Sequence, residues 1–255
     1  MYCFTFKIKP FLCVAILTCL MLGLFSFVHP LDSVETFCSP DGRNLPIYSV
    51  ETEEKKIALG INCAWDGEDI PDLLKSLEQN QSHATFFLLG LWAEKYPDLA
   101  QEIVLSGQEI GSHSQHHWDM NQLTEKEMQE EILASQKSIS SACGKVPILF
   151  RPPSGAYNEE VIKMIHQQGC IPIQWSIDTL DWKGLSGEEI TNRVLEKLSP
   201  GEIILLHSGA EHSAEALEKM LPLILEKGFQ VVPVGELILP GSSKVSASGR
   251  QLPKN

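Results

Sequence analysis

The chain has 255 residues, of which 43% are hydrophobic, and this is enough for one large domain with a single core. It carries 20 basic and 33 acidic residues, which give a formal net charge of -13. Such an acidic chain is a poor partner for a polyanion, so we expect no nucleic-acid ligand.

An uncharged run of 18 residues, Phe11–Val28, lies near the start of the chain. As a helix rising about 1.5 Å per residue, this run spans a bilayer core. Lys7 and Lys9 precede it and acidic residues follow it. By the positive-inside rule, residues 1–10 are a cytoplasmic tail, residues 11–28 are a single-pass signal-anchor in the cell membrane, and the rest lies outside. A cleaved signal peptide is the alternative, although no small-x-small cleavage pattern occurs near "FSFVHP".

Three further segments follow the expected anchor. Residues 29–55 are interpreted as a linker and lead-in, residues 56–239 as the folded domain, and the Ser/Gly/Lys-rich residues 240–255 as a disordered tail. Four cysteines outside the anchor have no metal-type CxxC spacing, so disulfides and buried thiols both stay open. They are Cys38, Cys63, Cys143 and Cys170.

Short apolar runs alternate with amphipathic runs through the expected domain. The predicted strands are Lys56–Asn62, Ala84–Leu89, Glu109–His113, Ile148–Arg151, Ile171–Ile177, Glu202–His207 and Gln230–Val232. The predicted helices lie between them: one opened by Pro71, Trp92–Ser106, one opened by a Thr124/Glu127 capping box, Asn158–Gln168, one opened by a Ser186/Glu189 capping box, and Ser213–Lys227. This alternation predicts an α/β fold with a parallel sheet that closes, or nearly closes, into a seven-stranded barrel. An open doubly wound sheet is the alternative, but no glycine-rich loop follows the first strand, so we expect no nucleotide.

Polar residues stand at the ends of five predicted strands, where such folds gather their active sites. They are Asn62, His113, Arg151, the pair Asp178 and Asp181, and His207. In "HSQHH", His113 and His117 are four residues apart, so on a helical turn both would face one way and could hold one metal ion. A surface histidine cluster is the alternative interpretation.

The motifs "HSQHH", "RPPSG", "DTLDW" and "LLH", in this order, resemble those of the polysaccharide deacetylases, the NodB-homology proteins of carbohydrate esterase family 4. The lead-in is most similar to the membrane-anchored, sporulation-associated branch found in Firmicutes. The resemblance implies a distorted (β/α)7 barrel of the NodB type. It also implies a divalent metal ion, zinc or else cobalt or nickel, and removal of N-acetyl groups from peptidoglycan or chitin-like sugars. The expected partners are therefore an acetylated glycan and, through the anchor, the membrane.

The same resemblance assigns roles to individual residues. His113 and His117 match the metal histidines, Arg151 the arginine that orients the catalytic base, and Asp181 the carboxylate that tunes the general acid, His207. Trp182 and Leu205 match apolar walls around the acetyl methyl group, and Tyr157 is assigned to substrate binding.

The first family motif, "TFDDGP", is replaced here by "GINCAWDGED". Asn62 stands at the position of the base and Cys63 at that of a metal ligand, so we expect Asp69 to be the third ligand, with Asp66 and Glu68 as alternatives. An amide cannot accept a proton from water. The expectation is a slow metal-dependent N-deacetylase in which Asn62 orients the water. The alternatives are a glycan-binding protein that has lost catalysis and an O-acetyl esterase.

Overall fold

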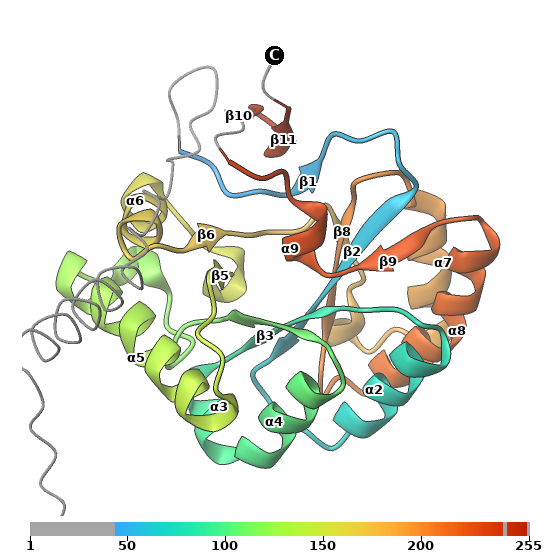
Figure 1. Ribbon diagram of the computed structural model, residues 1–255, viewed down its shortest axis with the longest axis horizontal. Coiled ribbons are helices and arrows are strands. Elements are labelled where there is room, and N and C mark those ends of the chain that lie inside the picture. Colours follow the sequence, from blue (N-terminus) through green and yellow to red (C-terminus); the bar gives the residue numbers. More distant parts are fainter. Residues whose placement is uncertain (1–43, 242–243, 254–255) are drawn as a thin grey trace, which may run out of the picture. The chain divides into compact units, whose positions relative to one another are not determined.

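The computed structural model describes residues 44–241 and 244–253 (Figure 1). The predicted anchor, Phe11–Val28, and its cytoplasmic tail lie outside these ranges. Within them, no helix combines the length and the apolar character that a membrane crossing requires.

Strand β2 (Lys56–Cys63) is the centre of the main sheet. Seven of its eight residues are buried, as expected for a parallel strand that is covered on both faces. It pairs in parallel with β3 (Thr85–Leu88), β8 (Ile203–His207) and β9 (Gln230–Val232). The apolar run "KIALGINC" therefore forms the middle of the fold, and it ends in Asn62 and Cys63.

The main sheet is parallel throughout and runs in the order β6-β5-β4-β3-β2-β8-β7, with β9 beside β2. The remaining strands are β4 (Glu109–Ser112), β5 (Leu149–Phe150), β6 (Ile171–Pro172) and β7 (Ile177–Asp178). The two end strands, β6 and β7, are joined by only four residues, 173–176, which span at most about 18 Å. The sheet must therefore curl until its ends approach each other. This arrangement confirms the distorted (β/α)7 barrel.

The predicted single strand Ile171–Ile177 is wrong, because it is two strands at opposite ends of the sheet. The backbone changes partner along this segment. The Ile173 N–H donates to the Phe150 carbonyl, the Gln174 N–H to Ile47, and the Ser176 N–H to Ile203. The segment 173–176 thus bridges the two end strands of the sheet.

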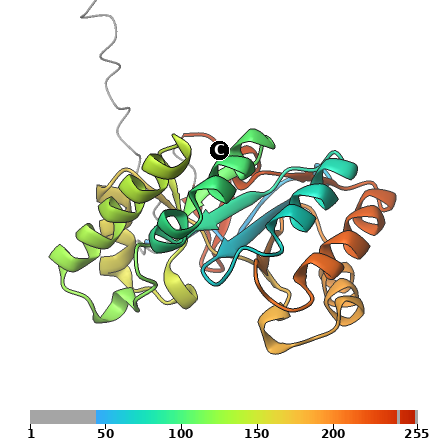
Figure 2. The same cartoon turned by 90° about the horizontal axis from the view of Figure 1, so that it is seen from below.

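The helices lie around the sheet (Figure 2). They are α2 (Ile70–Gln79), α3 (Gly90–Lys95), α4 (Pro97–Leu105), α5 (Glu125–Cys143), α6 (Glu159–Gln167), α7 (Gly187–Lys197), α8 (Ser213–Glu226) and α9 (Val234–Leu237). Both predicted capping boxes are present, at Thr124 and at Ser186. The predicted helix Trp92–Ser106 is instead two helices, because Pro97 lacks an N–H and begins the second one.

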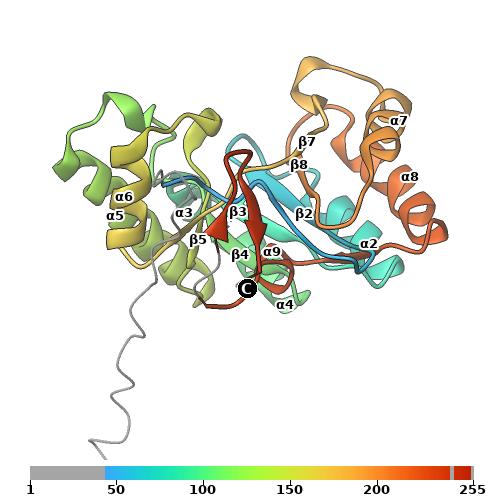
Figure 3. The same cartoon turned by 90° about the horizontal axis from the view of Figure 1, so that it is seen from above.

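The described part of the C-terminal segment is ordered, which corrects the prediction of a disordered tail at 240–255. Strands β10 (Lys244–Val245) and β11 (Arg250–Leu252) pair with each other, and β11 pairs with β1 (Ser49–Val50) (Figures 1 and 3). The side chain of Gln251 is fully buried, and its amide accepts from the Leu239 N–H and donates to the Leu239 carbonyl. Part of the predicted linker at 29–55 therefore belongs to the folded domain as well.

Candidate functional site

A cavity of about 400 Å³ opens at the carboxyl ends of the central strands. Its lining residues are Asn62, Ala64, Trp65, His113, His117, Ser154, Trp175, Asp178, Trp182, Leu205 and His207. Six of the expected site residues are thus brought together. Arg151 and Asp181 lie directly behind this lining, whereas Asp69 and Tyr157 do not line the cavity.

Asn62 forms the floor of the cavity between a guanidinium and an imidazole. Its Oδ1 accepts from Arg151 Nη1 at 2.8 Å, and its Nδ2 lies 3.3 Å from His113 Nε2. A guanidinium only donates, so the amide oxygen must face Arg151 and the NH2 group must face His113. His113 Nδ1 lies 2.7 Å from the Arg151 carbonyl, which only accepts. The proton of His113 is therefore on Nδ1, and Nε2 accepts from Asn62.

Arg151 is completely buried and contacts no carboxylate within the described ranges. Its other acceptors are the carbonyls of Gly60 and Gln174, and its guanidinium lies 4.0 Å from the ring centroid of Phe87. A Cβ at Gly60 would come within 2.4 Å of Nη2, so glycine at position 60 makes room for the guanidinium. Burial lowers the pKa of Arg151 to about 9, and the group is still a cation at neutral pH.

His113 and His117 meet through a loop and not through the helical turn that their spacing predicted. Ser114 and His117 both adopt left-handed backbone angles, with φ of 70° and 63°. Their rings still come together, with His113 and His117 centroids 5.0 Å apart. Buried Glu131 of α5 fixes this loop, because its carboxylate accepts from the N–H groups of Gln115 and His116.

The electrostatics of the histidine pair suit a metal ion only in part. Burial lowers the pKa of His113 well below its ordinary value and also lowers the pKa of His117, so both rings are neutral at pH 7, as ligation requires. Among residues 44–241 and 244–253, however, no three His, Cys, Asp or Glu side chains form a group that could hold a metal ion. Cys63 lies in the hydrophobic core, and the Nε2 of His113 already faces an N–H of Asn62. The arrangement of the described residues does not fit a bound metal.

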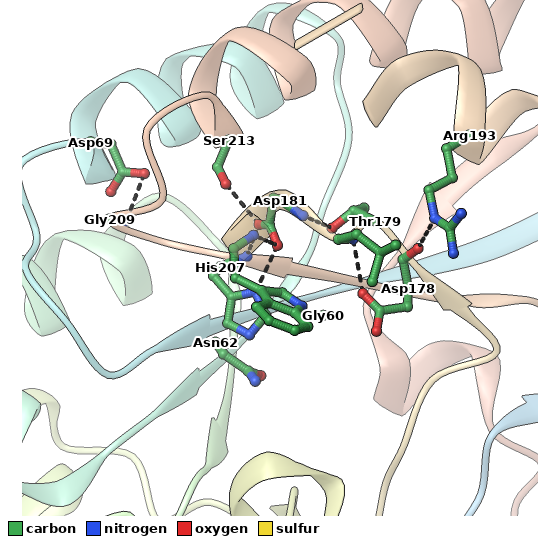
Figure 4. Close-up of polar contacts among 12 residues, drawn as sticks. Gly60, Asn62, Asp69, Asp178, Thr179, Asp181, Arg193, His207, Gly209 and Ser213 are labelled. Atoms are coloured by element: carbon green, nitrogen blue, oxygen red, sulfur yellow. Dashed lines mark hydrogen bonds and ion pairs between the residues drawn. The ribbon is translucent and has the colours of Figure 1, made fainter. Parts of the chain in front are cut away.

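Asp69, the expected third ligand, has a different position. Its Oδ1 accepts from Ser208 Oγ at 2.8 Å and its Oδ2 from the Gly209 N–H at 3.0 Å. Figure 4 shows it against the loop that follows β8, well apart from Asn62. The structure therefore does not place Asp69 with the two histidines, and sequence reasoning missed this because the pairing of the two loops is non-local.

His207 and Asp181 form a tightly bonded pair (Figure 4). Asp181 is 1% exposed and accepts four hydrogen bonds: from His207 Nδ1 at 2.8 Å, His207 N at 2.6 Å, Trp182 N at 2.9 Å and Ser213 Oγ at 2.7 Å. Burial by itself would raise the pKa of Asp181, but the bonds from His207 and Ser213 hold it below its ordinary value. The carboxylate keeps a proton on His207 Nδ1, and Nε2 remains available to the cavity.

Several lining residues received no role from the sequence. Trp65 stacks on His207 with ring centroids 5.3 Å apart and an interplanar angle of 22°. Trp175 lies in the segment between β6 and β7, and Ser154 lies in the 3-10 turn Pro153–Gly155 that follows Arg151. Tyr157, expected to bind substrate, instead hydrogen-bonds through its hydroxyl to Tyr48 at 2.9 Å, away from the cavity.

The same fold occurs in known proteins. A model of the family described as "Polysaccharide deacetylase" matches residues 49–172. The Bacillus cereus peptidoglycan-N-acetylglucosamine deacetylase is 35% identical over 189 residues, which cover 72% of this chain and 69% of that protein. An uncharacterised Bacillus subtilis protein, YlxY, is 35% identical over 193 residues, which cover 76% of this chain but only 60% of YlxY.

One solved relative is named a pseudoenzyme. The structure of BA3943 from Bacillus anthracis, a CE4 family pseudoenzyme, has a TM-score of 0.74 and 32% identity, and the match covers 82% of this chain and 73% of that one. A mutant of BA3943 is described as having restored enzymatic activity; it has a TM-score of 0.73 and 34% identity, covering 76% of this chain and 71% of that one. With the curved parallel sheet and the cavity at its carboxyl edge, these matches show that the chain belongs to the polysaccharide deacetylase (NodB, CE4) family.

Proposed function

We propose that this protein binds N-acetylhexosamine glycan of the cell wall in the cavity without hydrolysing it at the rate of a deacetylase. The observation that carries the proposal is the Asn62 amide, whose oxygen is held by Arg151 and whose N–H faces His113 Nε2. Hydrolysis of an N-acetyl group requires a base for the attacking water and a metal ion or other electrophile at the carbonyl. The described residues offer neither at this position.

The rest of the cavity supports glycan binding. Leu205, Ala64 and the indole of Trp182 give it apolar walls, while Asp178 and Ser154 supply hydrogen-bonding groups. Most ligand cavities share this mixture of apolar walls and a few polar groups. The related proteins named as deacetylases act on peptidoglycan and, in Bradyrhizobium, on chitooligosaccharides, so we assign the same class of sugar as the ligand here.

The test measures binding and acetate release on the same sample. The purified full-length protein should bind tetra-N-acetylchitotetraose by calorimetry, with and without added zinc. It should release no more acetate than the His207→Ala variant, since neither has a base for the water. Acetate release by the wild type that His207→Ala abolishes would overturn the proposal.

A slow hydrolase acting on N-acetyl or O-acetyl groups is the second candidate, and the His207–Asp181 pair favours it. This pair retains the geometry of a general acid, which a purely binding site does not need. An ester has a better leaving group than an amide, so residual activity should be greater on O-acetylated sugars. Metal dependence, with zinc, cobalt or nickel, belongs to this candidate and would show as acetate release that a chelator abolishes.

We also propose that Phe11–Val28 anchors the protein in the cell membrane with the described domain outside. The lysines before this run and its 18 uncharged residues support the proposal. Membrane fractionation tests it, and a soluble mature form beginning near residue 30 would contradict it. A role in sporulation remains a prediction from the resemblance of the lead-in.

A further inference from the structure

We infer that Trp65 is a carbohydrate-stacking platform of this cavity, that Asp69 holds it in position, and that its ligand is a pyranose ring of a β-linked hexosamine oligosaccharide. The inference rests on the proposed glycan-binding function and names the residue that selects the ring.

Trp65 is exposed in a way that a packing residue is not. Its side chain lines the cavity and is 50% exposed, although one face is stacked on His207. The uncovered surface of the indole is thus presented to the cavity and to solvent. A pyranose has an apolar C–H face and a polar hydroxyl rim, so it can cover an indole face while its rim stays hydrogen-bonded.

The loop that carries Trp65 is tied down on both sides. Asp69 binds Ser208 and Gly209 of the loop after β8, and Trp92 Nε1 donates to the Asp66 carbonyl at 3.0 Å. A Cβ at Gly209 would lie 3.2 Å from Asp66 Oδ1, so the two loops are in close contact. Ring stacking on such a fixed platform costs little ordering entropy.

The hydrogen bonds from Ser208 and Gly209 to the Asp69 carboxylate hold the Trp65 loop against the loop after β8. Both oxygens of the half-buried Asp69 carboxylate bind the loop after β8, because Oδ1 accepts from Ser208 Oγ and Oδ2 accepts from the Gly209 N–H. A carboxylate kept at such a site at the base of the Trp65 loop is a positioning group for the indole. The Asp69 side chain is hydrogen-bonded to the loop after β8 and does not line the cavity.

The cavity also supplies an acceptor for sugar hydroxyl groups. Asp178 is the one carboxylate among the described residues that line it. Asp178 Oδ1 accepts from the Leu180 N–H at 2.9 Å, and Figure 4 shows the second oxygen directed away from that bond. Oδ2 has no hydrogen-bond partner in the described part of the chain. An aromatic platform combined with a free carboxylate oxygen fits a polyhydroxylated ring better than a flat aromatic ligand.

The test compares two tryptophans of the same kind. Trp118 is 51% exposed and also stacks on a histidine, His116, at 4.4 Å and 15°, but it does not line the cavity. In the full-length protein, Trp65→Ala should weaken tetra-N-acetylchitotetraose binding about tenfold, the loss expected for roughly 60 Å² of apolar contact. Trp65→Phe should stay within about threefold of the wild type, and Trp118→Ala should bind like the wild type.

The other outcomes distinguish failure of the Trp65 inference from failure of the proposed function. If the wild type binds the oligosaccharide and Trp65→Ala binds it equally well, Trp65 only shields His207 and the inference is overturned, while the proposed function stands. If the wild type binds no glycan, both fail. Thermal unfolding of each variant shows whether a loss of binding reflects a loss of folding, and Trp65→Phe repeats the test with a ring in place.

The positioning role of Asp69 has a separate test. Asp69→Ala should weaken binding several-fold in the wild type but cause no further loss in the Trp65→Ala background, because its effect passes through the indole. An equal loss in both backgrounds would show that Asp69 acts by another route and would overturn its assignment as the tether.

Discussion

Each of the two sides of the cavity contains a buried charged group, and the two groups have different hydrogen-bond partners. On the His207 side, which comprises Asp181, His207 and Trp65, the buried charge is the carboxylate of Asp181. Four donors satisfy it, one of which is the imidazole that it orients. Hydrogen bonds to an ionised acceptor are among the stronger ones in proteins, and here they outweigh the cost of burial.

On the Asn62 side, which comprises Asn62, Arg151 and His113, the buried charge is a guanidinium. Its partners are the neutral oxygens of Asn62, Gly60 and Gln174 and the ring of Phe87. No anion among the described residues offsets the desolvation, and the pKa of Arg151 falls to about 9. An asparagine in place of an aspartate thus preserves the shape and the hydrogen bond to Arg151, but it replaces a proton acceptor by a donor.

The largest expected effect is therefore on the rate of acetate release, when a carboxylate replaces the amide of Asn62. Asn62→Asp should raise the rate of acetate release from N-acetylated oligosaccharide by about 10²-fold or more, because a carboxylate can take a proton from water and gives Arg151 an anion. The measurement is acetate release with zinc present and absent. Asn62→Ala is the control, since it removes both hydrogen bonds without adding a base.

Two outcomes would change the comparison. If Asn62→Asp is no faster than Asn62→Ala, the missing base does not limit the reaction. If Asn62→Asp is active but adding His207→Ala leaves the rate unchanged, the His207 side does not act as the acid.

The second prediction removes the charge from the intact side. Asp181→Asn should lower the free energy of unfolding by about 2–4 kcal/mol, because the new amide cannot accept from all four donors and leaves buried N–H groups unpaired. Urea unfolding measures this. Asp178→Asn is the matched control, because within the described residues the Asp178 carboxylate accepts one hydrogen bond, from the Leu180 N–H, and the change should be below about 1 kcal/mol. Equal losses in both variants would show that the four hydrogen bonds to Asp181 do not contribute more to the free energy of unfolding than the one bond to the Asp178 carboxylate.

The comparison also shows what the sequence can and cannot reveal. The apolar run ending at Asn62, the capping boxes at Thr124 and Ser186, and the strand end at His207 are local patterns, and the structure reproduces them. The order of the motifs placed the histidines, Asn62 and His207 at one edge because parallel strands share that edge.

The errors arise where partners are distant in the chain. Asp69 is 140 residues from Gly209, and nothing in the sequence around either residue indicates their hydrogen bond. The break within Ile171–Ile177 depends on which strand each backbone group meets, and the ordering of the C-terminal strands depends on β1. Composition and periodicity do not carry this information.

A third prediction concerns the loop that joins the Asn62 side to α5. Glu131→Gln should lower the free energy of unfolding by about 1–3 kcal/mol, because the buried side chain loses its charge while two N–H groups and His116 still require an acceptor. Glu130→Gln, at the neighbouring exposed position, loses only a surface pair with Lys126 and should change by less than about 1 kcal/mol. Similar values for the two variants would mean that the histidine loop does not depend on Glu131.

The smallest expected effect is on the pH dependence of the free energy of unfolding. It comes from His113, on the Asn62 side of the cavity, at mildly acid pH. Its pKa is lowered well below the ordinary value, mainly by burial and then by His117, so the folded protein keeps the ring neutral where the unfolded chain takes up a proton. Protonation of the unfolded state alone destabilises the fold as pH falls below about 6.5, and no such penalty exists at higher pH. For one histidine this costs about 0.7 kcal/mol between pH 7 and pH 6.

Urea unfolding at both pH values should show that His113→Gln removes this share of the pH dependence, because glutamine does not titrate. If the wild type and His113→Gln lose the same free energy between pH 7 and pH 6, His113 is not held neutral by its surroundings. In that case the bond from the Asn62 N–H to its Nε2, on which the contrast between the two sides depends, does not form.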